Sequence, residues 1–372
     1  MHVGGMPDRS ARPADSGFRA PTAMRATRRT TCAGDRIGAC DPGHDDPRCR
    51  GARSAFARRL RGLGAVWLMI VAGTATAGRA AEVQRDVVVY GATAAGVTAA
   101  TAAARHGASV MLLEPGRHVG GMISGGLGHT DILRQEDLIG GLALEFFRRV
   151  GRHYGLPVAW DFEPHVAEET LKAMLAEAGV EVRFGCPLAE ARSENARLQW
   201  LRTGDGDTHA ARVFIDASYE GDLMKAAGVS YTVGREGRER YGESLAGRGE
   251  LLPGRHQFHV EVSPWLDGKL LPSITPQDRI APVGAGDGGI QAYCFRLCLT
   301  DRPENRLPIG PPEGYDPSRY ELLRRYLAAL DPGEKPRPLL GFARIPNGKC
   351  DANSTGPVSS NLPGASWEYP EA

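Results

Sequence analysis

The sequence predicts an α/β fold, with a parallel sheet and helices, joined to an irregular α+β region. Two observations carry this prediction. A strand, a small-residue turn, a helix and a second strand follow one another within residues 86–114, which is the order of one βαβ unit. After Gly228 long periodic segments become rare, and much of the chain is rich in Gly, Pro and Arg. We therefore expect an α/β domain at 82–228 and an irregular cap region, which faces the substrate, at 229–340.

Composition places the chain among ordinary globular proteins. Its 372 residues suffice for two domains, at roughly 100–200 residues each. Hydrophobic residues make up 42% and charged residues 24%. The formal net charge of +1 gives no overall attraction to nucleic acids or membrane surfaces, so we expect no nucleic-acid partner. The oligomeric state is not predictable from these features.

The cysteines do not form a recognisable metal site. There are seven, no CxxC pair occurs, and the nearby histidines lack zinc-finger spacing. We therefore expect no bound metal. Two interpretations of Cys294 and Cys298 remain possible: a redox pair, or ordinary buried thiols.

The N-terminal residues have the order of a secretory signal. A basic cluster at 58–61 precedes an uncharged apolar run at 63–77, which ends in small residues. We expect a signal peptide at 57–81, an exported protein that is periplasmic or secreted, and no membrane span after cleavage. A buried core helix or an uncleaved anchor is the alternative. Residues 1–56 have little periodicity and are interpreted as a disordered extension, with the start codon placed too early.

The elements of the mature chain follow from apolar periodicity and from the residues that end each segment. We expect buried strands at 87–90, 110–113 and 213–216, a strand at 181–185, a hairpin of 188–191 with 198–201, and helices at 97–106, 142–154, 163–178, 221–227 and 320–330.

The first turn, residues 91–96, predicts a dinucleotide-binding site of the Rossmann type. Gly91 permits a tight turn and Gly96 lets the helix approach the strand, while Thr93 replaces the usual middle glycine and offers a hydroxyl to a phosphate oxygen. Glu114 ends the next strand, 23 residues after Gly91, where a carboxylate binds the ribose of adenosine. It disfavours a 2′-phosphate, so NADP is not expected. The alternative is a generic α/β turn with a surface glutamate.

A second glycine-rich stretch follows at residues 120–128. Gly120 and Gly121 come directly after the acidic strand end and indicate a backbone that lies flat against a ligand. This favours FAD over NAD, with a flexible loop as the alternative. Later in the chain, Glu220 and Asp222 stand at a helix start, where helix capping is the simplest interpretation.

Four segments in this order, 88–96, 114–122, 216–223 and 346–349, resemble the FAD-dependent oxidoreductase family. This family is often exported in bacteria and is related to fumarate-reductase-type and glutathione-reductase-type flavoproteins. The resemblance runs from about Asp86 to the end of the chain.

The resemblance implies non-covalent FAD in a Rossmann-like domain. The residues that it implies are Gly91, Thr93, Ala94, Ala95 and Gly96 at the pyrophosphate, Glu114 at the adenosine ribose, Gly120 and Gly121 along the pyrophosphate and ribitol, the backbone of Leu188 at adenine, and Asp216 and Ala217 on the returning strand.

One departure concerns the end of the chain. The family usually closes the flavin site with a late glycine-rich segment, and this sequence stops at Ala372 before one. Residues 341–372 are therefore interpreted as a truncated segment in which the chain returns toward the FAD domain.

The expected function is flavin-mediated hydride transfer from an unidentified small molecule. An NAD-binding dehydrogenase and a non-catalytic fragment remain alternatives. His129 and Asp131 follow the glycine-rich loop, and Arg235 and Arg296 are cations suited to an anionic substrate. Nothing in the sequence places these four at a reaction centre, so no catalytic residue is assigned.

Overall fold

The structure is a computed structural model that describes residues 82–132, 135–252, 256–272 and 274–357, together with four single residues, 361, 364, 366 and 367. The predicted extension at 1–56 and signal peptide at 57–81 lie outside the described residues. The chain divides into two units, Met1–Gly73 and Thr74–Ala372, and all of the described residues belong to the second. In its described part, no helix combines the length and apolarity needed to cross a membrane.

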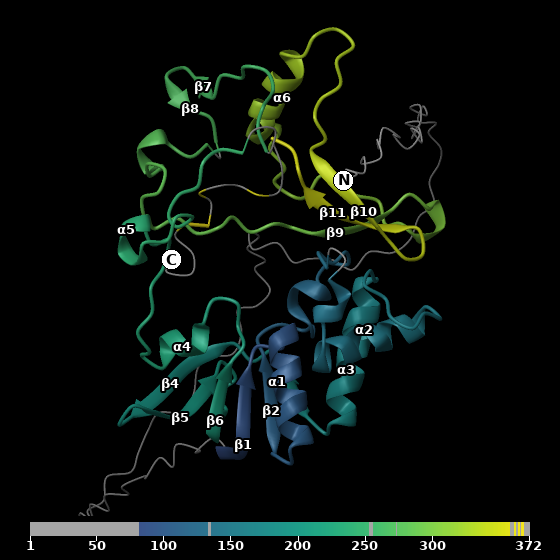
Figure 1. Cartoon of the computed structure of the whole chain (residues 1–372), viewed down its shortest axis with the longest axis vertical. Coiled ribbons are helices and arrows are strands. Elements are labelled where there is room, and N and C mark those ends of the chain that lie inside the picture. Colours follow the sequence, from purple (N-terminus) through teal and green to yellow (C-terminus); the bar gives the residue numbers. More distant parts are fainter. Residues whose placement is uncertain are drawn as a thin grey trace, which may run out of the picture. The chain divides into compact units, whose positions relative to one another are not determined.

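A six-stranded sheet forms the centre of the α/β region (Figure 1). Its order is β3-β2-β1-β6-β5-β4, and β3, β2, β1 and β6 are parallel. The strands are β1 (Glu82–Tyr90), β2 (Val110–Glu114), β3 (Glu181–Phe184), β4 (Leu188–Glu194), β5 (Arg197–Thr203) and β6 (Thr208–Asp216). The β4–β5 hairpin adds antiparallel strands at one edge. The predicted Rossmann-like α/β fold is confirmed.

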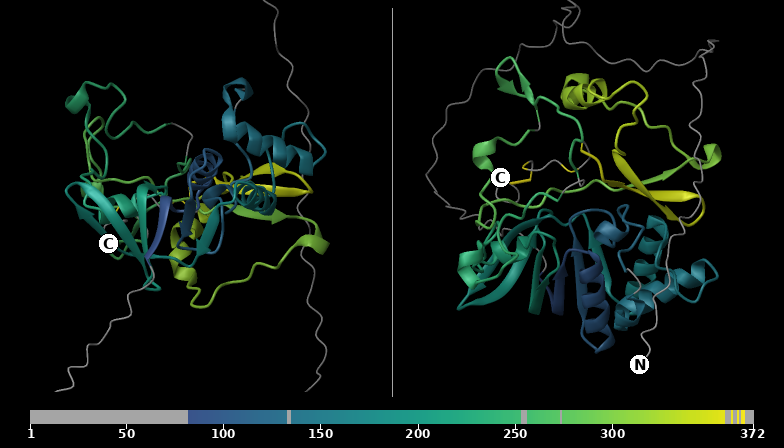
Figure 2. Two further views of the ribbon diagram at one scale, coloured as in Figure 1. Left: turned by 90° about the horizontal axis from the view of Figure 1, so that it is seen from below. Right: turned by 45° about the horizontal axis from the view of Figure 1, so that its top comes forward.

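Helices and sheet enclose two cores because alternate strand residues point to opposite faces. The α-helices of this region are α1 (Ala94–Arg105), α2 (Gly141–His153), α3 (Pro164–Glu177) and α4 (Asp222–Ala226). Val87 and Val89 of β1 join one core with α1, α2 and α3, and Val88 and Tyr90 join a second core on the other face. The views in Figure 2 show α1 packed along the strands.

The prediction of a fully buried strand at 213–216 was wrong. Val213 is 51% exposed, although its β1 partner Val87 is only 8% exposed. The two residues share a face of the sheet, but α1 packs mainly against β1 and β2. Val213 therefore lies beyond the cover that α1 provides, whereas Ile215, further along the same face of β6, packs against the core.

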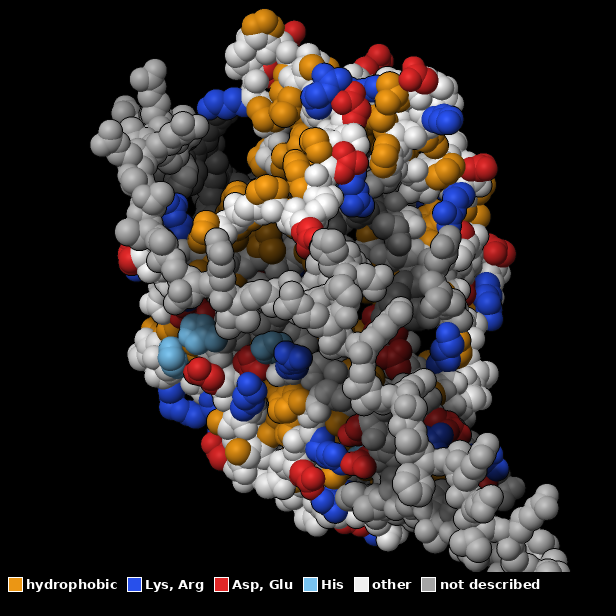
Figure 3. All heavy atoms as spheres, turned by 180° about the vertical axis from the view of Figure 1, so that it is seen from behind, with side chains coloured by type: hydrophobic (Ala, Val, Ile, Leu, Met, Phe, Trp, Pro, Cys, Tyr) orange, Lys and Arg blue, Asp and Glu red, His pale blue; other side chains and the backbone are white. Residues whose placement is uncertain are grey.

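The chain after Gly228 is irregular and carries short elements. These are α5 (Arg238–Tyr241), β7 (Trp265–Leu266), β8 (Lys269–Leu270), β9 (Leu297–Thr300), α6 (Glu321–Ala328), β10 (Leu340–Ile345) and β11 (Lys349–Ser354). β10, β11 and β9 form an antiparallel sheet. Several large hydrophobic side chains here are exposed, among them Leu245, Leu307 and Ile309, and Figure 3 shows patches of hydrophobic side chains on one face.

A buried ion pair connects the β10–β11 turn to the start of α3. Glu163 is 2% exposed, contacts the Lys349 ammonium, and accepts a hydrogen bond from Asn347 Nδ2 at 2.6 Å. The Tyr154 hydroxyl lies 3.2 Å from the same carboxylate. Burial by itself would raise the pKa of Glu163, but these partners hold it below the ordinary value. The Asn-Gly-Lys turn is therefore fastened to the α/β region through one carboxylate.

Candidate functional site

The turn between β1 and α1 needs glycine at both ends. Gly91 has φ +95°, and a Cβ there would lie 2.8 Å from the Ser218 amide nitrogen. A Cβ on Gly96 would lie 1.9 Å from the carbonyl oxygen of Gly91. Both positions therefore exclude side chains for the steric reasons that the sequence motif implies.

The predicted role of the Thr93 hydroxyl is corrected. Its Oγ1 donates a hydrogen bond to the Ala217 carbonyl oxygen at 2.8 Å and accepts one from the Gly96 amide at 3.2 Å. Thr93 is the N-cap of α1 and is 7% exposed. The hydroxyl is therefore used to cap the helix and to bind the β6 end to the turn, and it does not point out as a free phosphate ligand. A threonine directly before a helix is itself a capping signal.

The first turn of α1 leaves backbone donors available. Within the described residues, the amides of Ala94 and Ala95 make no hydrogen bond, and Ala95 is exposed. No acidic side chain occupies this helix turn. Free amides at the positive end of a helix dipole are a general binding site for phosphate groups.

Glu114 lies beside this helix start and organises the adjacent backbone. Its carboxylate accepts hydrogen bonds from the amides of Ala92 and Gly116, both at 2.7 Å. Its carbonyl oxygen accepts one from the Cys186 amide at 3.0 Å. The structure thus brings the predicted ribose ligand next to the segment that leads into Leu188.

The Leu188 amide already has a partner inside the protein. It donates to the hydroxyl of Tyr90 at 2.9 Å. Burial raises the pKa of Tyr90 to about 12, and the nearby carboxylates of Asp222 and Glu114 add to the effect. A neutral tyrosine hydroxyl therefore holds the start of β4 against the end of β1. The predicted adenine contact of Leu188 stays a prediction.

The glycine pair after β2 packs against the same turn. The Gly120 amide donates to the Ala92 carbonyl oxygen at 2.7 Å, and Gly120 forms a parallel bridge with Thr93. Gly121 has φ +57°, and a Cβ on it would lie 2.1 Å from the Tyr219 hydroxyl. That hydroxyl accepts a hydrogen bond from the Met122 amide at 2.7 Å. Tyr219 is a site residue that the sequence reasoning missed.

Asp216 and Ala217 reach the site differently from each other. Ala217 packs against Gly96, where an added Cβ would lie 3.1 Å from the Ala217 Cβ. The Asp216 carboxylate instead accepts hydrogen bonds from the Met224 amide at 2.8 Å and from the Ser218 hydroxyl at 2.6 Å. Asp216 therefore binds the first turn of α4, and its approach to a cofactor stays a prediction.

The predicted capping by Glu220 and Asp222 was wrong. The N-cap of α4 is Gly221, with no side-chain capping bond. Glu220 accepts a hydrogen bond from the Tyr293 hydroxyl at 3.0 Å. Burial raises the pKa of Asp222, and the charge of Asp216 adds to this. The Ser218 hydroxyl accepts the amides of Gly221 and Asp222 at the helix start instead, and the Asp216 carboxylate accepts the Met224 amide.

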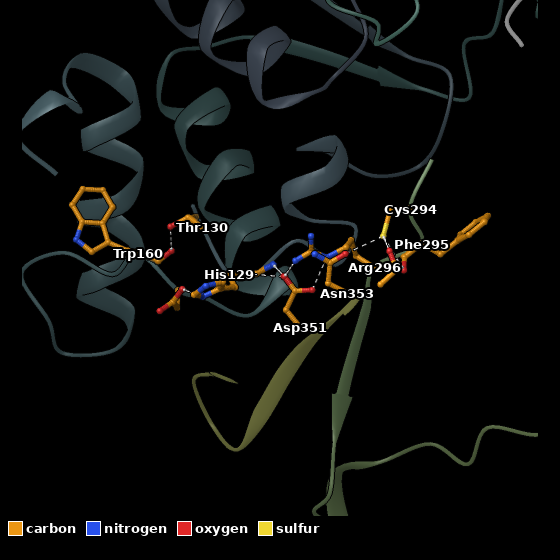
Figure 4. A network of polar contacts seen from close by, with 11 residues as sticks. His129, Thr130, Trp160, Cys294, Phe295, Arg296, Asp351 and Asn353 are labelled. Carbon is orange, nitrogen blue, oxygen red and sulfur yellow. Dashed lines mark hydrogen bonds and ion pairs between the residues drawn. The ribbon is translucent and has the colours of Figure 1, made fainter. Parts of the chain in front are cut away.

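The far end of the glycine-rich loop rests on a buried carboxylate. Asp351 is 0% exposed, and its Oδ2 accepts hydrogen bonds from the amides of Gly128 and His129, both at 3.1 Å. The Arg296 guanidinium donates to both oxygens, at 2.8 and 2.5 Å (Figure 4). Arg296, a candidate for an anionic substrate by its sequence, is therefore neutralised inside the protein. Asp351 had no local sequence signal, because its partners are distant in sequence.

The cysteines close to this network are not joined by a disulfide. Cys294 and Cys298 are both free of disulfides, and Cys298 is exposed. The Cys294 thiol donates to Asn353 Oδ1 at 3.2 Å, as Figure 4 shows. The two cysteines therefore do not form a disulfide here. Cys298 is also not the ordinary buried thiol that the second interpretation of the sequence expected.

His129 is held by a second acid. Its Nδ1 lies 2.8 Å from Asp161 Oδ1, and both side chains are more than 40% exposed, at 44% and 42%. Asp131 is exposed as well. Arg235 pairs with Asp287, with Nε at 2.8 Å from Oδ1. The contacts fasten these side chains to the fold, and we assign none of them a catalytic role.

Comparison with known proteins completes the description of the site. Residues 86–371 match the family described as FAD dependent oxidoreductase. A vinyl phenol reductase from Lactiplantibacillus plantarum is 67% identical over 36 residues, which are 10% of this chain and 7% of the reductase.

Among solved structures, a geranylgeranyl bacteriochlorophyll reductase-like protein from Thermoplasma acidophilum aligns with a TM-score of 0.31 and 22% identity, over 40% of this chain and 43% of that one. L-proline dehydrogenase from P. horikoshii aligns with a TM-score of 0.33 and 14% identity, over 42% of this chain and 59% of the dehydrogenase. The chain thus spans less than two thirds of the length of each of these relatives. By the match over residues 86–371, the chain belongs to the FAD dependent oxidoreductase family.

Proposed function

We propose that this chain binds FAD non-covalently and transfers a hydride between the flavin and a small organic substrate. The observation that carries the proposal is the convergence of three elements on one turn. The α1 start, the Glu114 carboxylate and Gly120 of the glycine pair are all joined to the backbone of Ala92 or Thr93. FAD is the cofactor of the family to which the chain belongs.

Each element has a role that its chemistry permits. The amides of Ala94 and Ala95 would bind the pyrophosphate, because they are donors at a helix N-terminus. Glu114 would accept hydrogen bonds from the ribose hydroxyls. Each of its oxygens already accepts one amide, but an ionised carboxylate has about four acceptor positions, so two positions remain. Thr93 serves the same site indirectly by capping α1.

The backbone of the glycine pair would lie flat against the remainder of the cofactor. Gly120 and Gly121 both have positive φ, at +108° and +57°, so their backbone takes a path that side chains would obstruct. Bound FAD supplies the hydride chemistry, while the protein positions it and controls access to it. The glycine-rich loop that would border the flavin is anchored by Asp351 at its far end.

The test is the cofactor content of the purified full chain. We expect a yellow protein with flavin absorbance, and heat release of the chromophore should identify it as FAD rather than FMN. Titration of a flavin-free sample with FAD, NAD and NADP should give binding with FAD alone. A correctly folded chain that binds NAD in preference to FAD, or neither after reconstitution, would disprove the proposal.

We further propose that the protein is exported, with residues 57–81 as its signal peptide. The support is the order of basic, apolar and small residues in that segment. Expression in a bacterial host, followed by cell fractionation and mass determination of the mature chain, tests this. We expect a periplasmic product whose first residue lies between 78, directly after the small residues at 75–77, and 82. An intact N-terminus recovered with the cytoplasmic fraction would contradict it.

A further inference from the structure

A cavity of about 880 Å³ lies in the region after Gly228. This volume falls within the range of roughly 300–1,000 Å³ that is usual for small-molecule pockets. Its lining includes two arginines, Arg235 and Arg248, together with the apolar side chains of Ile280, Ile290 and Trp367. None of these residues belongs to the proposed FAD site.

One short segment, 284–287, holds both arginines at the cavity. The Arg248 amide donates to the Ala285 carbonyl oxygen at 2.9 Å, and the Arg248 carbonyl oxygen accepts from the Gly284 amide at 2.8 Å. Arg235 makes the equivalent pair of backbone hydrogen bonds with Asp287, at 2.8 and 3.1 Å. The backbone of each arginine is therefore fixed, and the two positions are 13 residues apart in sequence but adjacent along this segment.

The two guanidinium groups differ in their partners. Arg235 binds Asp287 with two contacts, one of them Nε to Oδ1 at 2.8 Å. Arg248 is partly buried, and in the portion of the chain that the structure describes its guanidinium makes no hydrogen bond or ion pair. The hydrogen bond from Arg235 is the main cause of the lowered pKa of Asp287, to which the charge of Arg248 also contributes. Two cations therefore surround one carboxylate, which leaves an excess positive charge.

The remaining charge at the cavity does not cancel this excess. Glu250 also lines the cavity, but it is exposed, so water screens its effect. The Arg279 guanidinium lies over the Trp367 ring, 5.0 Å from its centroid. Arg248 is only partly buried and has no acceptor among the residues that the structure describes, so its paired donors are available to an anion in the cavity.

We propose that this cavity binds a small organic carboxylate, with Arg248 as the anchor for the carboxylate and Ile280, Ile290 and Trp367 against its apolar body. A guanidinium presents paired donors that match the two oxygens of a carboxylate. The apolar wall favours a hydrocarbon or aromatic body over a bare inorganic anion.

Residues 289–296 run from the cavity to the glycine-rich loop of the proposed cofactor site. Gly289 and Ile290 line the cavity, while Tyr293 donates to Glu220 and the Arg296 carbonyl group abuts Gly126 of the glycine-rich loop. A role of this carboxylate as the substrate of the flavin reaction would rest on the proposed function, whereas binding of the carboxylate itself does not depend on that function.

Calorimetric titration of the full chain with benzoate, cinnamate and indole-3-acetate, each beside its neutral amide, tests the inference. We expect at least one carboxylate to bind more than tenfold tighter than its amide. Arg248→Gln should lower the affinity for that carboxylate by about tenfold or more and leave the affinity for its amide unchanged. Arg248→Lys should recover part of the affinity for the carboxylate. Arg306→Gln, which removes an exposed arginine elsewhere, is the matched control.

Three outcomes would overturn the inference. They are no binding by any of the carboxylates, equal binding of acid and amide, and full binding by a folded Arg248→Gln variant. Circular dichroism of the variant verifies its fold. FAD content is measured on the same samples. Retained FAD without carboxylate binding refutes this inference alone, and carboxylate binding to a chain that cannot hold FAD refutes the proposed function alone.

Discussion

The buried carboxylate of Asp351 and the guanidinium of Arg296 form a two-contact ion pair, at 2.8 and 2.5 Å, between residues 55 positions apart. The same carboxylate accepts the amides of Gly128 and His129. One side chain thus joins β11, the segment before β9 and the end of the glycine-rich loop. The hydrogen bonds to this carboxylate fix the backbone at the end of the loop, which suits a segment that must lie against a ligand.

Replacement of Asp351 should therefore destabilise the protein strongly. Asp351→Asn leaves Arg296, whose side chain is only 20% exposed, without a counter-charge, and breaking a buried pair typically costs about 3–5 kcal/mol. We expect a loss of this size in the free energy of unfolding from urea denaturation. Asp137→Asn, at an exposed position, should change it by no more than about 0.5 kcal/mol. Equal stability of the two variants would show that the pair is dispensable.

The Glu114 carboxylate should contribute to FAD affinity. Glu114→Gln keeps the shape but removes the charge and one acceptor oxygen, and hydrogen bonds to charged groups contribute about 1.5–3 kcal/mol. We expect the dissociation constant of FAD to rise at least tenfold, measured by quenching of flavin fluorescence. Glu169→Gln, on the exposed face of α3, is the control and should bind FAD as the wild type does. An unchanged constant in Glu114→Gln would remove this residue from the site.

Gly96 should not tolerate even a methyl group. In Gly96→Ala the new Cβ would lie 1.9 Å from the Gly91 carbonyl oxygen, so the turn and α1 must separate. We expect FAD binding to be lost and the melting temperature to fall. Gly140→Ala is a matched control, because nothing lies within 4 Å of its added Cβ and its φ of −137° suits any residue. If both variants melt and bind alike, the close approach at Gly96 is not needed.

The Glu163 cluster predicts acid sensitivity. The folded-state pKa of Glu163 lies below its ordinary value of 4.5, so the folded protein binds the proton less readily than the unfolded chain. The stabilisation is present above pH 4.5 and is lost as pH falls through the lower folded-state pKa. Urea denaturation across this range should show a steeper decline for the wild type than for Glu163→Gln. Parallel pH profiles would contradict the assignment.

The sequence predicted the βαβ unit well because its signals are local. Apolar runs for β1 and β2, the glycines of the turn and the small residues of α1 lie within one short stretch, and each acts on its immediate neighbours. The helices α2 and α3 and the hairpin β4–β5 followed from periodicity in the same way. The structure places Glu114 and Gly120 beside this turn, because their positions relative to it follow from the order of the unit, and their contacts to a cofactor stay a prediction.

The errors arose where a contact partner is far away in sequence. The Thr93 hydroxyl binds the Ala217 carbonyl group, 124 positions later, and the exposure of Val213 depends on where α1 packs. Asp351 reaches Gly128 across 223 positions.

The sequence by itself determined the βαβ unit, the glycines of its turn and the family. Only the tertiary structure decided which polar groups remain free for a ligand, which are used to hold the loop, and that Arg248 faces a cavity while Arg296 is neutralised. The physical reason is that hydrogen-bond partners of buried groups are chosen by three-dimensional proximity, which local residue patterns do not encode.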